Sequence, residues 1–151
     1  MEKAHVAQLS LVWRKRTCGG GRTSREFLDF VIDGESLWER IDSDLISCLG
    51  WLADELNQKH VRRLLCKVPA DFPDERRSLF ICPECAELGC GALTAVIERI
   101  DDNIVWRDFG IQNDHTDEIW RTDLADLGPF FFNATEYYQV LNSGIDFNNE
   151  Q

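Results

Sequence analysis

The sequence predicts an α+β fold, a largely antiparallel sheet with helices packed on one face. Several short segments alternate between apolar and polar residues, which is typical of half-buried strands. Short connections join most of these segments, and helical spacing is confined to the middle and the C-terminal end. With 151 residues, of which 44% are hydrophobic, the chain is expected to form a single domain over residues 1–151, with residues 148–151 frayed.

The first two strands are predicted at residues 6–16 and 26–33, and a glycine-rich segment at residues 18–24 joins them. Loops that bind phosphate lie between a strand and a helix and carry Gly-Lys-Ser/Thr. Here the next element is a strand and that tripeptide is missing. The segment is therefore interpreted as a hairpin loop.

Helical spacing occurs in three places. Residues 36–41 form one or two turns, and residues 45–65 form a longer helical stretch that Gly50 divides in two. The third helix begins after Asn133, an N-cap residue with a glutamate three positions later, and Gly144 is expected to end it.

The second half of the chain holds the clearest hairpin. Residues 92–100 and 104–110 alternate on either side of the turn at residues 101–103. A short apolar strand is predicted before them at residues 79–82. Residues 130–132, three consecutive phenylalanines, form either a buried strand or a loop plug.

Charge is the most informative part of the composition. The net charge is −11, and residues 101–151 alone hold 11 acidic and 2 basic side chains. Such a field repels phosphate backbones, so nucleic acid is not expected as a partner, whereas a basic protein would be attracted. No apolar run reaches bilayer length and the N-terminus does not resemble a signal peptide, so we expect a cytoplasmic protein without a membrane partner.

Three of the six cysteines lie close together, at Cys82, Cys85 and Cys90. A C-x2-C pair can belong to a zinc site or to a thiol-redox motif. A closed zinc site needs a fourth ligand, for which the distant candidates are Cys66, His60 and His115. A redox motif should open a helix, and Gly89 and Gly91 oppose that. The remaining interpretation is a turn without metal or cofactor, and this is the one we adopt.

Catalytic motifs are missing from the sequence. No nucleophile elbow, zinc-protease signature or phosphate loop occurs. The acidic segment around His115 does not have the ligand spacing of a calcium loop. We therefore predict that the protein is not an enzyme and has no catalytic residue.

The segment at residues 79–113 contains CPEC followed after two residues by LGCGA, and later VWRDFG. This pattern resembles a segment that recurs in small, uncharacterised bacterial proteins. In size and charge the chain is also similar to the immunity proteins of contact-dependent growth inhibition toxin systems. The resemblance implies that the protein binds a toxin and implies no catalytic residues.

The function predicted is therefore that of an immunity protein, which neutralises a cognate toxin domain, such as a basic nuclease, through an acidic surface. The alternatives are a small zinc-binding or thiol-redox protein that uses the three cysteines, and a scaffold or adaptor domain whose partner is not basic. The predicted partner-binding residues combine carboxylates with two aromatic anchors: Asp101, Asp102, Asp108, Asp114, Asp117, Glu118, Asp123, Asp126, Trp106 and Trp120.

Overall fold

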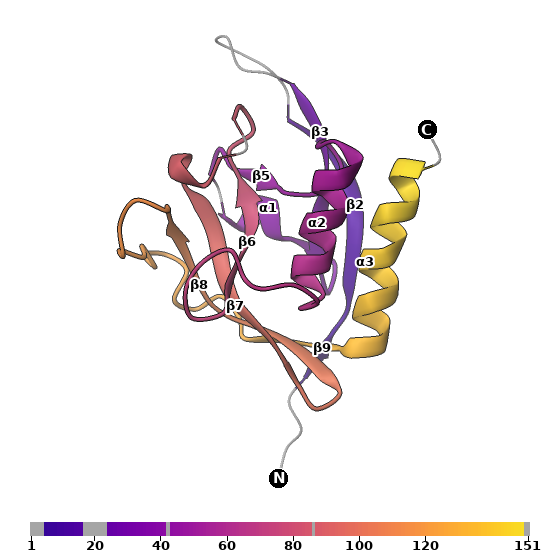
Figure 1. Ribbon diagram of the computed structural model, residues 1–151. Helices are drawn as coiled ribbons and strands as arrows, with labels where there is room; N and C mark the ends of the chain where they lie inside the picture. The colour runs from indigo at the N-terminus through magenta and orange to yellow at the C-terminus, as the bar shows by residue number, and fades with distance from the viewer. Residues whose placement is uncertain (1–4, 17–23, 42, 86, 150–151) are drawn as a thin grey trace.

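The computed structural model describes residues 5–16, 24–41, 43–85 and 87–149, with side chains as far as residue 143. Two sheets form most of the fold (Figure 1). The larger sheet has six strands in the order β1 (Val6–Ala7), β9 (Phe130–Asn133), β8 (Asn103–Gln112), β7 (Ala92–Ile100), β6 (Arg76–Ile81) and β5 (Ile46–Ser47). The smaller sheet has the order β2 (Leu9–Arg16), β3 (Arg25–Ile32) and β4 (Glu35–Ser36).

Hydrogen bonds join the two sheets into one curled layer. β1 and β2 are separated by a single residue, and the Leu28 amide of β3 donates to the Leu49 carbonyl beyond β5 at 3.0 Å. The Ser47 hydroxyl donates to the carbonyl of Leu28. All neighbouring strands are antiparallel except β1 and β9. The predicted α+β class is confirmed.

Three α-helices and one short 3-10 helix are assigned in the described residues. They are α1 (Leu37–Ile41), α2 (Asp54–Leu64), η1 (Leu88–Cys90) and α3 (Ala134–Asn149). Helices α2 and α3 lie side by side and pack on the curled sheet (Figure 1). Because α3 begins directly after β9, its first turn lies against the core.

Aromatic side chains connect the layers in the core. Trp106 of β8 is fully buried and packs edge-to-face on Phe30, Phe132 and Tyr137. Its indole N–H donates to the Tyr137 hydroxyl at 3.2 Å, and that hydroxyl donates to the Leu64 carbonyl at 2.6 Å. One chain of contacts thus links β8 and α3 to the end of α2.

Both predicted hairpins are confirmed. Strand β2 pairs with β3 from Leu9–Ile32 to Arg16–Arg25, and β7 pairs with β8 around the turn before Asn103. The glycine-rich connection at residues 17–23 lies outside the described residues. The N-cap at Asn133 is also confirmed, because its side-chain oxygen accepts the Glu136 amide at 3.0 Å.

Two helix boundaries were predicted wrongly. The stretch at residues 45–65 is helical only over α2, because its first part pairs with neighbouring strands as β5 and because Gly50 adopts φ +100°. Gly144 does not end α3, which continues to Asn149. A glycine weakens a helix interior without forcing it to stop.

Candidate metal centre

A ten-residue loop at residues 82–91 joins β6 to β7 and carries the three clustered cysteines. Cys82 follows the last residue of β6 and is half-buried, whereas Cys85 and Cys90 are exposed. The 3-10 turn η1 places Cys90, and Gly91 next to it has φ +100°, a conformation that allows the chain to turn into β7. Strand end, turn and glycine thus bend the loop back on itself.

The loop brings the three sulfur atoms together. Their Sγ atoms all lie within 4.8 Å of one another, and the Cys85 and Cys90 Sγ atoms are 2.8 Å apart. All three are free thiols. The prediction of a turn that only buries thiols does not anticipate this convergence on one point.

Their immediate surroundings favour unequal protonation. Partial burial, which alone would raise the pKa of Cys82, is outweighed by hydrogen bonds from the Cys85 and Glu84 backbone amides and from the two neighbouring thiols, so that pKa is lowered. The hydrogen bond with Cys85 raises the pKa of Cys90 to about 12. Cys82 therefore becomes a thiolate more readily than Cys90.

Two arginines from the β2–β3 hairpin hold the Cys82–Cys85 turn. The Arg25 Nε donates to the Pro83 carbonyl at 3.0 Å. The Arg16 guanidinium, whose side chain is 6% exposed, lies 3.3 Å from the Glu84 carboxylate and 3.3 Å from Asp44. These contacts anchor the Cys82–Cys85 turn to the β2–β3 hairpin. The sequence gives no local sign of them.

Of the distant ligand candidates, only His115 approaches the cysteine loop. Cys66 contacts the Ile97 carbonyl on β7, and His60 hydrogen-bonds with Arg63 within α2. Burial lowers the pKa of His60 to about 4, which suits a neutral ring packed on the fold. The His115 ring, in contrast, lies against Gly89, the residue before Cys90.

The predicted partner-binding residues do not form one surface. Asp101 and Asp102 lie in the β7–β8 turn, at one end of β8, and Asp114 lies just beyond the other end. Ten residues of strand separate these ends, a distance of roughly 30 Å. The predicted acidic surface is therefore divided between two ends of the sheet.

Asp108 is paired with arginines of the same chain, and Trp106 is buried in the core. The Asp108 carboxylate accepts hydrogen bonds from Arg121 and, at 3.0 Å, from the buried Arg76. These bonds, the one from Arg121 first, lower the pKa of Asp108. Because Trp106 is 0% exposed, the expectation that it anchors a partner at the surface is wrong.

The other predicted residues lie in the segment between β8 and β9. Trp120 is 48% exposed, and its backbone pairs with Ile111 through two hydrogen bonds of 2.8 Å, which close a loop around residues 113–119. Asp126 is paired with Arg40 at 2.8 Å, and Asp123 accepts from the same arginine through its carbonyl. A groove of about 290 Å³ runs beside the loop, and its acidic lining residues are Asp71, Asp74, Asp114 and Asp117.

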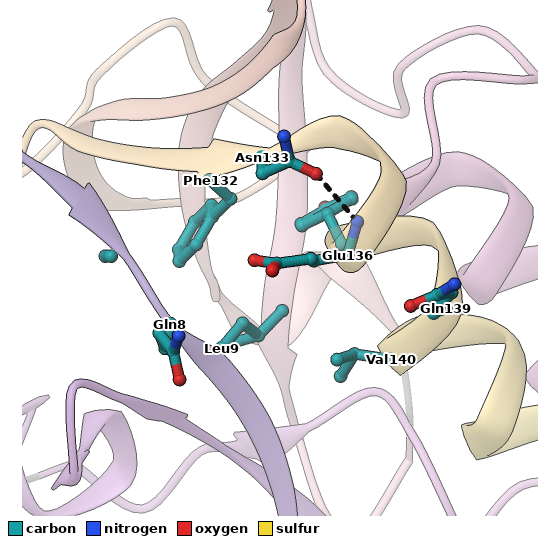
Figure 2. Close-up of a pocket in the computed structure, with 9 residues that line it drawn as sticks. Gln8, Leu9, Phe132, Asn133, Glu136, Gln139 and Val140 are labelled. Atoms are coloured by element: carbon teal, nitrogen blue, oxygen red, sulfur yellow. Dashed lines mark hydrogen bonds between the residues drawn. The ribbon is translucent and has the colours of Figure 1, made fainter.

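A pocket of about 230 Å³ lies between β2 and the first turn of α3 (Figure 2). The Glu136 side chain extends between Phe132 and Leu9, and the Asn133 side chain is engaged in capping the helix. This pocket offers a single carboxylate without a second convergent group. It therefore offers fewer side chains that could act in catalysis or bind a metal than the cysteine loop does.

No family model, curated protein or solved structure matches the chain. In the described residues, none of the helices combines the length and the apolar character needed to cross a bilayer.

Proposed function

We propose that the protein binds one zinc ion through Cys82, Cys85 and Cys90. The observation that supports this most directly is the convergence of three Sγ atoms within 4.8 Å. Tetrahedral zinc with bonds of about 2.3 Å needs sulfur atoms roughly 3.8 Å apart. The Cys85 and Cys90 sulfur atoms, now 2.8 Å apart, would have to separate by about 1 Å to reach that spacing. Soft thiolate ligands select zinc over magnesium or calcium.

The surrounding charges suit such an ion. Three thiolates and Zn²⁺ would carry a net charge of −1, and the Arg25 guanidinium, which donates to the Pro83 carbonyl of the same loop, brings a positive charge to that loop. Both Arg16 and Arg25 flank the hairpin loop, so the ion would fix the β6–β7 loop against the β2–β3 hairpin. The role we infer is structural, because a bound ion adds its binding free energy to folding.

Metal content of protein purified without chelator and under reducing conditions tests the proposal. We expect about one zinc per chain, as for a single structural site. Cys90→Ser should lower the zinc content sharply. The matched control is Cys66→Ser, because Cys66 is a half-buried thiol that contacts Ile97 and lies outside the cluster.

A protein that contains no metal and does not take up added zinc would refute the proposal. If the same protein instead formed a Cys85–Cys90 disulfide reversibly, the thiol-redox alternative would replace it. Peptide mapping by mass spectrometry distinguishes that disulfide from three reduced thiols. Equal zinc loss in the Cys90→Ser and Cys66→Ser variants would also count against a local site.

We propose, as a second function, that the protein is an immunity protein that binds a basic toxin domain. The supporting observation is the exposed Trp120 beside the loop that carries Asp114, Asp117 and Glu118. An exposed aromatic ring next to carboxylates is the composition of a binding hot spot with an electrostatic rim. Compared with the sequence prediction, this surface omits six residues: Trp106, Asp108, Asp101, Asp102, Asp123 and Asp126.

Charge reversal tests this second function. Asp114→Lys, Asp117→Lys and Glu118→Lys together should abolish protection of cells that express the cognate toxin domain. Asp101→Lys with Asp102→Lys at the far end of β8 is the matched control and should leave protection intact. Equal protection by both variants, with equal affinity at low salt, would contradict the proposed surface.

A further inference from the structure

We propose that His115 supplies the fourth ligand of the zinc site, so that the ion cross-links the cysteine loop to the acidic loop at residues 113–119. This inference rests on the proposed zinc function. Three cysteines leave one tetrahedral position open, and a structural site requires that position to be filled. The question is which side chain is close enough to fill it.

The side chains of His115 and Asp114 lie over Gly89, next to the cysteine cluster. A methyl group built on Gly89 would lie 2.7 Å from the His115 Nε2 atom and 3.4 Å from the Asp114 Oδ1 atom. Both side chains therefore lie directly over the backbone of the residue that precedes Cys90. Only glycine allows another side chain to approach the chain so closely.

The loop that carries His115 is held in place by its own hydrogen bonds. The Asn113 side-chain oxygen accepts the His115 amide at 2.8 Å and the Thr116 amide at 3.1 Å. The Ile111–Trp120 bridge closes the loop behind them. These bonds fix the backbone, while the His115 side chain is 72% exposed.

Coordination requires the His115 side chain to rotate toward the three sulfur atoms. In the structure His115 lies outside the group whose ligand atoms are within 4.8 Å of one another. Either ring nitrogen can bind the ion, and the other would donate to the Asp114 carboxylate, which is 3.7 Å from Nε2. A carboxylate that orients a ligating histidine in this way is a common feature of zinc sites.

A neutral imidazole is also the ligand that the local charge favours. A fourth carboxylate would bring the site to a net charge of −2 beside Asp114 and Asp117, whereas His115 leaves it at −1. Of the other candidates, Cys66 is bonded at Ile97, five residues along β7 from Ala92 and therefore roughly 16 Å away. His60 is engaged with Arg63.

X-ray absorption spectroscopy of the zinc-loaded protein tests the ligand set. We expect three sulfur atoms at about 2.3 Å and one nitrogen at about 2.0–2.1 Å. His115→Ala should remove the nitrogen. It should also weaken zinc binding, measured by chelator competition, by about 10–100-fold or more, as changes around such sites do. His115→Cys should restore tight binding with a fourth sulfur.

The control variant is His5→Ala, since His5 is exposed and pairs with Asp33, the residue that follows β3. It should leave both the spectrum and the affinity unchanged. A wild-type spectrum with four sulfur atoms and no nitrogen would overturn the inference and leave the zinc proposal standing. A wild-type shell of three sulfurs and one oxygen would do the same. Protein that binds no zinc would overturn both.

Discussion

Replacing Gly89 by alanine should have opposite effects on stability with and without zinc. Gly89 does not have a positive φ, so alanine fits its backbone. Glycine-to-alanine changes at such positions stabilise by about 0.4–1 kcal/mol, because they restrict the unfolded chain. The new methyl meets the tip of the exposed His115 ring, which can move aside. In chelator, we therefore expect a small gain in the free energy of unfolding.

With saturating zinc the sign should reverse. Moving the His115 ring away from Cys90 should weaken zinc binding about tenfold, which corresponds to about 1.4 kcal/mol. Because zinc binds only the folded protein, this loss of binding free energy lowers the free energy of unfolding in zinc by the same amount. The net change in zinc is then a loss of about 0.4–1 kcal/mol, the difference between the two effects.

Urea unfolding in chelator and in zinc measures both numbers. Gly34→Ala is the control, because Gly34 has φ +83° in an open turn and alanine should destabilise it equally in both conditions. If Gly89→Ala changes the free energy of unfolding by the same amount with and without zinc, the juxtaposition of Gly89 and His115 has no role in metal binding. That result would refute the reasoning.

Three further predictions concern the core and the ion-pair network. Tyr137→Phe removes the hydroxyl that bonds the Trp106 indole and a helix carbonyl, and it should cost about 2–6 kcal/mol in urea unfolding, at about 1–3 kcal/mol for each of the two buried groups left unpaired. Asp108 has a pKa lowered chiefly by an arginine hydrogen bond, so its contribution to stability is complete above the usual aspartate pKa of about 3.9 and is lost as the pH falls below it. Asp108→Asn should flatten this acid limb of the pH–stability curve, and an unchanged limb would contradict the ion pair. Gly110→Ala should destabilise by about 1–3 kcal/mol in thermal unfolding, because the methyl would overlap the Ile119 side chain at 2.4 Å.

Local patterns in the sequence predicted the structure correctly where residues close together in the chain determine it. Alternation at residues 92–100 and 104–110 predicts a hairpin that the structure contains, because register there follows from a short turn. The same reasoning failed at residues 46–49. Their apolar spacing is helical, but the Leu49 carbonyl accepts a hydrogen bond from Leu28, which is distant in sequence. Long-range pairing overrides helix propensity.

The candidate site was predictable only in part for the same reason. The spacing of Cys82, Cys85 and Cys90 indicates that three thiols can meet within one loop. The contacts that complete the site come from far away in the chain, since Arg16 and Glu84 are 68 residues apart. The carboxylates show the opposite case. Charge counting cannot tell that Asp108 is bonded to Arg76 within the fold.

Native mass spectrometry of the full chain, purified without chelator in reducing buffer, tests the central claim most directly. We expect a single species that carries one zinc ion, and we expect that ion to be lost when Cys82 is replaced by serine. A wild-type spectrum that contains only metal-free chain, before and after incubation with zinc, would contradict it.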